Sequence, residues 1–161
     1  MKATFLALFV SLITLTTACA QSPRVTADGK NVSVAYGQPS KKGRVIFGGL
    51  QKYGEVWRAG ANEATEITFE KDATFAGKPV KAGTYTLFAI PTENEWTVIL
   101  NGDTKFWGTQ YEQHKGKDVL QVNVPVKKTD SVVEKLTYRF AGDDMIIEWD
   151  EAQVVIPVKI S

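Results

Sequence analysis

TYTLFAIPTENEWTVILN, residues 84–101, holds two runs of β-branched and aromatic residues, separated by a polar segment at 91–94. In the second run, Trp96, Val98 and Leu100 occupy every second position. Because the side chains of a β-strand point alternately to opposite faces, this spacing is typical of a strand with one buried face. The stretch therefore predicts two strands joined by a short connection, with Trp96 in the core.

The same alternation recurs on both sides of this stretch. It is present in NVSVAY (31–36), ATEITFE (64–70), DVLQVNVPV (118–126), VEKLTYRF (133–140), MIIEWD (145–150) and VVIPVKI (154–160). Only residues 109–115 could form a helical turn. We therefore predict an all-β fold with little helix: a single-domain antiparallel β-sandwich, jelly-roll or Ig-like, over residues 21–161. Trp149 is assigned to the core by its alternation with Ile147, and Pro157 predicts that the last strand lies at a sheet edge.

Residues 1–20, MKATFLALFVSLITLTTACA, have the form of a secretory signal peptide, with a lysine, an apolar run and a small-residue end. The final ACA fits a cleavage site that would leave Gln21 first. Alternatively, Cys19 would become the lipid-modified first residue of a lipoprotein. Soluble export is favoured because Thr16 stands where a lipoprotein signal usually has leucine. Both routes predict an exported protein, periplasmic or extracellular, with no transmembrane segment in the mature chain.

Charge and cysteine content exclude several classes of function. The chain has 19 Lys and Arg and 18 Asp and Glu, and removing the leader removes one lysine, which leaves a net charge of zero. This balance does not favour binding to nucleic acid or to an anionic membrane. Cys19 is the only cysteine, so the mature domain has no disulfide or thiol nucleophile. The single histidine and the acidic residues lack the spacing of a known metal motif, so we predict no metal and no cofactor and leave the oligomeric state open.

Two segments lack the alternation of the strands. They are GRVIFGGLQKYGEVWRAGANEAT (43–65) and NGDTKFWGTQYEQHKGK (101–117). Long irregular segments in a compact domain are usually functional or disordered, and the aromatic residues of the second segment argue against disorder. The candidate site is therefore sought in these two loops.

The first of these segments resembles the signature of a known family. The resemblance lies in Gly43-Arg44, Phe47-Gly48, Leu50, Tyr53-Gly54, Val56-Trp57-Arg58 and Gly60-Ala61-Asn62-Glu63-Ala64-Thr65, and continues in Gly77-Lys78, Ala82-Gly83-Thr84-Tyr85, Ile90-Pro91 and Glu95-Trp96. On these residues the chain resembles the DUF2911 family, which consists of exported bacterial proteins of unknown function that are common in Bacteroidota. The resemblance covers essentially the whole mature chain. It implies a periplasmic or extracellular all-β domain and supplies no substrate and no catalytic residue.

The first segment also contains side chains suited to holding a small polar ligand. A guanidinium group offers five donors that match a carboxylate, and aromatic rings offer flat apolar faces with a polar edge. The predicted ligand-binding residues are Arg44, Tyr53, Trp57, Arg58, Asn62 and Glu63, with Trp107 on the second segment as a lid or rim. The predicted ligand is a saccharide or a small organic anion.

Two other interpretations fit the same residues. Arg58 could pair with Glu63 to brace a loop and Trp57 could belong to the core, which would make the protein a structural or protein-interaction module. A small hydrolase could instead use Glu63 with His114, since a histidine side chain titrates near neutral pH. The polar neighbours of His114 favour an exposed side chain, however, and no catalytic motif is present. Binding is therefore favoured over enzymatic activity, and the catalytic residues are unknown.

Overall fold

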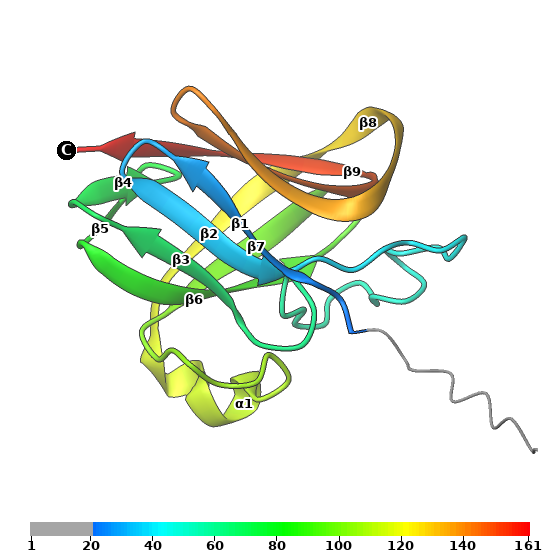
Figure 1. Ribbon diagram of the computed structural model, residues 1–161, viewed down its shortest axis with the longest axis horizontal. Helices are drawn as coiled ribbons and strands as arrows, with labels where there is room; N and C mark the ends of the chain where they lie inside the picture. The colour runs from blue at the N-terminus through cyan, green and yellow to red at the C-terminus, as the bar shows by residue number, and fades with distance from the viewer. Residues whose placement is uncertain (1–20) are drawn as a thin grey trace, which may run out of the picture.

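The computed structural model describes residues 21–161, which form one antiparallel sheet of nine strands in the order β1-β2-β3-β6-β7-β8-β9-β4-β5 (Figure 1). The strands are β1 (Arg24–Gly29), β2 (Val32–Gly37), β3 (Thr65–Phe69), β4 (Ala73–Phe75), β5 (Lys78–Val80), β6 (Gly83–Pro91), β7 (Glu95–Asn101), β8 (Asp118–Ala141) and β9 (Asp144–Ile160). The helical residues described are α1 (Tyr111–His114) and the 3-10 turn Lys115–Lys117. The predicted all-β, antiparallel fold with little helix is confirmed.

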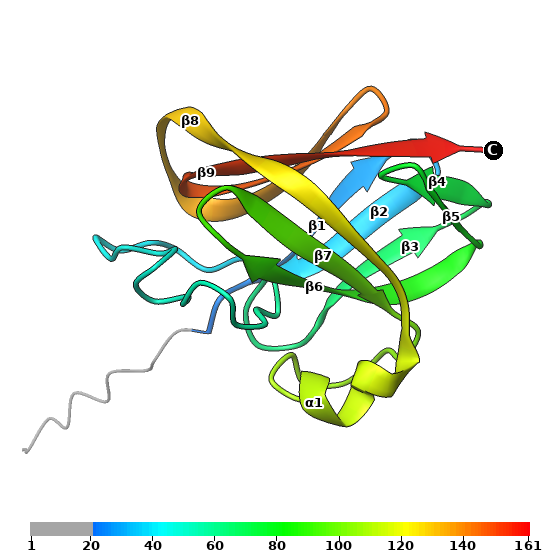
Figure 2. The same ribbon diagram turned by 180° about the vertical axis from the view of Figure 1, so that it is seen from behind.

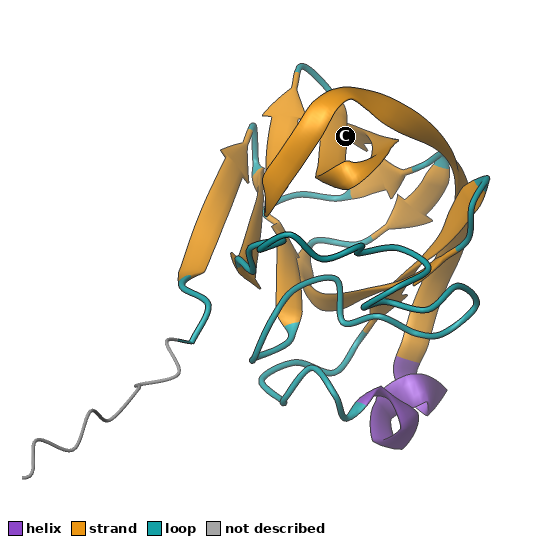
Figure 3. Cartoon of the chain, turned by 90° about the vertical axis from the view of Figure 1, so that its right-hand side faces the viewer, coloured by secondary structure: helices purple, strands orange, loops and turns teal. Residues whose placement is uncertain are grey.

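The long strand β8 changes partner along its length, and this bends the sheet. Its first part pairs with β7 and its second part pairs with β9 (Figure 2). The backbone that follows β2 then reaches β8, because Lys41 N donates to Glu134 O at 2.7 Å and Leu136 N donates to Pro39 O at 3.0 Å. Seen from one end, the sheet curls around its interior, with the loops gathered at that end (Figure 3).

The interior of the curl is the hydrophobic core, and the alternating residues of the strands fill it. Trp96 and Trp149 are 0% and 2% exposed, as predicted from their spacing. Strands that are distant in the sheet meet here, since the rings of Tyr36 on β2 and Tyr138 on β8 have centroids 4.5 Å apart. Burying a large side chain of this kind contributes roughly 1.5–3 kcal/mol to folding. Packing in the core therefore stabilises the curled sheet, and the loops at its end connect strands that are held in place.

The prediction that the last strand lies at a sheet edge is wrong. Strand β9 lies between β8 and β4, and the end strands of the sheet are β1 and β5. Pro157 is tolerated because it lies past the last residue of β9 that pairs with β8, Val154. On its β4 side it faces Ala76, one residue beyond the end of β4, and its carbonyl accepts a hydrogen bond from Ala76 N at 2.8 Å. The missing N–H thus affects only the end of one strand pair.

The predicted signal peptide, residues 1–20, and its Cys19 lie outside the described residues. Among residues 21–161, no helix has the length and apolar character needed to cross a membrane.

Candidate functional site

The first loop, residues 43–65, joins the sheet at Trp57. Trp57 N donates to Ala89 O at 2.7 Å and Ala89 N donates to Trp57 O at 2.9 Å, so this residue extends the sheet beside β6 just beyond the last β3–β6 pair, Thr65 with Leu87. Trp57 turns its ring into the core. Because side chains alternate along an extended chain, the next residue, Arg58, turns its side chain away from the core.

The Trp57 ring belongs to an aromatic cluster within the core. Its centroid lies 5.5 Å from that of Phe47, 5.6 Å from that of Trp96 and 6.0 Å from that of Trp149. Edge-on and offset ring pairs at these separations are favourable. Trp57 is only 5% exposed, so it offers little surface to a ligand. The structure places this predicted binding residue mainly in the core.

The chain after Arg58 is fixed by internal hydrogen bonds. The Ala59 carbonyl accepts from the Tyr138 hydroxyl at 2.7 Å and from Thr65 Oγ1 at 3.1 Å. Ala59 and Asn62 have positive φ angles of 49° and 63°, which reverse the chain twice within four residues. Gly60 is required at its position, since a Cβ there would lie 2.4 Å from Thr65 Oγ1. This loop is therefore held in one conformation before any ligand arrives.

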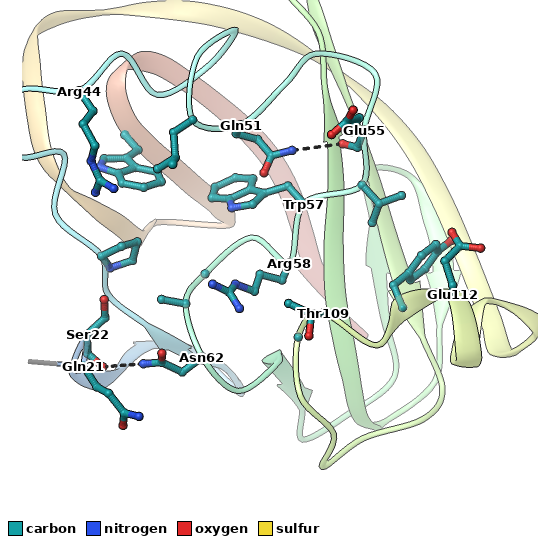
Figure 4. Close-up of a pocket in the computed structure, with 18 of the residues that line it drawn as sticks. Gln21, Ser22, Arg44, Gln51, Glu55, Trp57, Arg58, Asn62, Thr109 and Glu112 are labelled. Atoms are coloured by element: carbon teal, nitrogen blue, oxygen red, sulfur yellow. Dashed lines mark hydrogen bonds between the residues drawn. The ribbon is translucent and has the colours of Figure 1, made fainter. Parts of the chain in front are cut away.

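A hollow of about 1090 Å³ opens beside this loop, at the end of the sheet where the loops gather (Figure 4). It is lined by residues that lie far apart in the sequence. They include Ser22, Pro39, Arg44, Leu50, Gln51, Glu55, Val56, Arg58, Asn62, Gly108, Thr109 and Glu112. We call it the arginine hollow, because Arg44 and Arg58 both direct their guanidinium groups into it (Figure 4). Its volume lies slightly above the range of about 300–1,000 Å³ that is typical of small-molecule sites.

Arg58 is the most unusual residue of the arginine hollow. It is half-buried, and within residues 21–161 its guanidinium makes no hydrogen bond and no ion pair. Burial alone lowers the pKa of Arg58, because desolvation disfavours the charged form. Its stem packs against Gly108, where a Cβ would lie 2.7 Å from Arg58 Cδ. The glycine leaves room for the arginine, and the arginine's charge is left without a counter-ion.

Arg44 adds a second positive charge that no carboxylate of residues 21–161 compensates. Its Nε donates to Lys41 O at 2.9 Å and its Nη2 donates to Ser40 O at 2.7 Å. Carbonyl oxygens orient the guanidinium but do not neutralise it. The turn that carries Arg44 is itself tied to β9, since Lys41 Nζ pairs with Asp150 at 2.9 Å and Ile46 N donates to the same carboxylate at 3.1 Å. Arg44 is thus directed at the arginine hollow by a braced turn.

The remaining predicted site residues do not all join the arginine hollow. Asn62 lines it and donates from Nδ2 to Ser22 O at 3.1 Å. Tyr53, 42% exposed, is not among the lining residues, and its ring lies against Gly48. Glu63 and Trp107 line a separate hollow of about 550 Å³. The single wall predicted from the sequence is therefore divided between two hollows.

The ion pair between Arg58 and Glu63, which the structural interpretation requires, is not present among the described residues. Glu63 instead lies 3.5 Å from Arg24, whose Nη1 also donates to Ala64 O at 3.2 Å. The two left-handed residues at 59 and 62 separate Arg58 from Glu63, so that neighbours in the sequence face different hollows.

His114 lines neither hollow. Its Nδ1 lies 2.9 Å from Asp103 Oδ2, and its ring stacks on Phe106 with centroids 3.9 Å apart. Its side chain is 25% exposed, so it is less open to solvent than expected. His114 and Glu63 share no hollow in the described part of the chain, which leaves the predicted hydrolase pair without a common cleft.

The second loop, residues 101–117, forms a rim of the arginine hollow, but not through its tryptophan. Gly108, Thr109, Tyr111 and Glu112 are the residues of this loop that line the hollow. Tyr111 is fixed by its hydroxyl, which donates to Asp118 at 2.6 Å; burial and this carboxylate raise the pKa of Tyr111.

Sequence reasoning missed Gly108 and Thr109, and the one signal for them was their place beside Trp107. It also missed Gln51, for which the sequence offers no signal beyond membership of the first loop.

No cluster of three or more histidine, cysteine, aspartate or glutamate side chains suited to a metal ion occurs within residues 21–161.

Comparison with curated proteins and with solved structures gave no match. Comparison with protein families matched residues 19–158 to the family described as "Protein of unknown function (DUF2911)". Because the match spans nearly the whole chain, the protein belongs to the DUF2911 family.

Proposed function

We propose that this protein binds a small organic anion in the arginine hollow, through Arg58 and with help from Arg44. The observation that carries the proposal is the half-buried guanidinium of Arg58, which has no counter-ion within residues 21–161. Burying a charge is costly unless it is paired. A bound carboxylate would supply the missing partner in the bidentate geometry that guanidinium groups favour.

The arginine hollow suits an anion better than a saccharide. Sugar sites use exposed aromatic faces, whereas Trp57 and Trp149 are 5% and 2% exposed at the floor of this hollow. Tyr53 lies outside it. The accessible lining instead combines the two arginines with amide and hydroxyl groups and the exposed Leu50. This combination favours a carboxylate that carries an apolar group.

The test is Arg58→Gln compared with Lys30→Gln, which removes the same charge from an exposed turn. In a thermal-shift screen of mono- and dicarboxylates at constant ionic strength, a ligand at about 100 times its Kd stabilises by about 2.7 kcal/mol, or roughly 5–10 °C for a domain of this size. We expect a saturable shift in the wild type and in Lys30→Gln and its loss in Arg58→Gln. Equal shifts in all three proteins would overturn the proposal.

The unliganded stability of Arg58→Gln separates this proposal from the structural alternative. Because Arg58 has no ionic partner in the described chain, its replacement breaks no pair, and we expect a change within about 0.5 kcal/mol in urea unfolding. A loss of several kcal/mol would instead favour a bracing role for Arg58.

We also propose that the protein acts outside the cytoplasm, on the strength of the leader sequence in residues 1–20. The mass of the mature N-terminus tests the two routes of export. A soluble product is expected to begin at Gln21, whereas a diacylated or triacylated Cys19 would indicate a lipoprotein, and an intact leader would contradict export.

A further inference from the structure

We propose that the ligand of the arginine hollow is a zwitterion, a short peptide whose carboxylate meets Arg58 and whose free amino group meets Glu55. This inference rests on the proposed function and assigns it a substrate class. It starts from the acidic side chains of the hollow, which the anion proposal leaves without a role.

Glu55 is a free carboxylate at the edge of the arginine hollow. It lines the hollow, and within residues 21–161 its side chain has no ion pair and no hydrogen bond. The other acidic lining residue, Glu112, is already paired with Lys115 at 2.7 Å. Among the described lining residues, Glu55 is thus an unpaired negative group, whereas Arg44 and Arg58 are unpaired positive groups, and Arg58 is the half-buried one.

Glu55 and Arg58 are close in sequence but do not pair with each other. They are three residues apart, and no ion pair joins them within 4.0 Å. The pair formed by Glu112 and Lys115 has the same separation, but those residues lie on a helical turn, where side chains three apart meet. Glu55 instead lies at a bend, and Arg58 follows the bridge between Trp57 and Ala89, so the two side chains leave the backbone in different directions (Figure 4). The two opposite charges thus line one hollow without contacting each other.

A ligand that satisfies both charges must carry a cation and an anion separated by a spacer. An α-amino group and an α-carboxylate joined through a peptide bond have this form. The arginine hollow also offers Leu50, 54% exposed, and Val56 as apolar surface, together with the Gln51 amide. Gln51 Nε2 reaches backbone carbonyls only at 3.4 and 3.5 Å, so it is weakly engaged. It can donate to a peptide carbonyl.

The size of the arginine hollow favours a short peptide over a single amino acid. At about 1090 Å³ it exceeds what one amino acid would fill. Two arginines, Arg44 and Arg58, and two glutamates, Glu55 and Glu112, line it, so the formal charges of the lining cancel. A neutral dipeptide with apolar side chains complements this lining.

The test compares three probes by isothermal titration calorimetry: the dipeptide Leu-Leu, N-acetyl-Leu-Leu and Leu-Leu amide. We expect Leu-Leu to bind, acetylation to weaken binding roughly fivefold to tenfold, and the amide to bind most weakly, because it cannot engage Arg58 bidentately. Glu55→Gln should remove the preference for Leu-Leu over its acetylated form. Glu70→Gln, which changes an exposed carboxylate just beyond the C-terminal end of β3, should keep it.

The pH dependence gives a second measurement. A terminal amino group titrates near pH 8, so the affinity for Leu-Leu should fall as the pH rises through about 8 while that for N-acetyl-Leu-Leu stays constant. If N-acetyl-Leu-Leu binds as tightly as Leu-Leu and Glu55→Gln changes neither, the zwitterion inference is overturned and the anion proposal stands. If neither these probes nor any simple carboxylate binds, both are overturned.

Discussion

Gly37→Ala is expected to lower the free energy of unfolding by about 3 kcal/mol or more, a large part of the roughly 5–15 kcal/mol that is typical of a folded domain. Gly37 is the last residue of β2, and the Cβ of an alanine there would lie 2.0 Å from Ala61 O and 2.8 Å from Ala61 C. Those atoms are backbone and cannot rotate away. The loop that carries them is held by the two hydrogen bonds to the Ala59 carbonyl. The added methyl group must therefore move either β2 or this loop.

Urea unfolding followed by tryptophan fluorescence measures this loss. Gly116→Ala is the matched control, because nothing lies within 4 Å of the corresponding Cβ and its φ is not in the left-handed region. Such a change is expected to be neutral or to stabilise by up to about 1 kcal/mol. Equal midpoints for the two variants would show that β2 and the 59–65 loop do not approach each other this closely.

Trp57→Ala should destabilise the protein by about 3–5 kcal/mol, as is typical when a large aromatic side chain is removed from a core. The indole contacts Phe47, Trp96 and Trp149, and its removal leaves a cavity that these rings cannot all move to fill. The stacked pair with Trp149, with 20° between the ring planes, should also contribute to the near-ultraviolet circular dichroism. Both the melting temperature and that signal are expected to fall.

Trp107→Ala provides the comparison, since it removes the same side chain from a position that is 44% exposed. We expect it to cost less than about 1 kcal/mol. A larger loss for Trp107→Ala than for Trp57→Ala would reverse the roles assigned to the two residues.

The strands could be predicted from the sequence because alternation is a local signal. Trp96, Val98 and Leu100 are all fully buried on β7, as their spacing indicates. Alternation does not indicate which strands pair with each other. The runs 118–126 and 133–140 were predicted as separate strands, yet both belong to β8, and the polar residues between them cross the irregular part of its pairing with β9. The strand that contains Pro157 was wrongly predicted to lie at a sheet edge for the same reason, since the neighbours of a strand depend on residues that are distant in the sequence.

The site could be predicted only as a region. The first loop was singled out by its lack of alternation, and Arg44, Arg58 and Asn62 do line one hollow. Its charge partners could not be inferred, because the ion pair of Glu63 is supplied by Arg24, from β1. The alternative pairing of Glu63 with Arg58 rested on their proximity in sequence, whereas Glu63 follows the left-handed residue Asn62 and lines the other hollow.

The Ala59 carbonyl, which accepts two hydrogen bonds, affects how the protein would bind a ligand. Because Tyr138 and Thr65 already hold that carbonyl, the backbone beside Arg58 is preorganised, and association need not spend free energy on ordering it. Structures with and without ligand should superpose along residues 57–65, with adjustment confined to side-chain rotamers. Affinity at this place would then depend on the complementarity of the ligand rather than on an induced rearrangement.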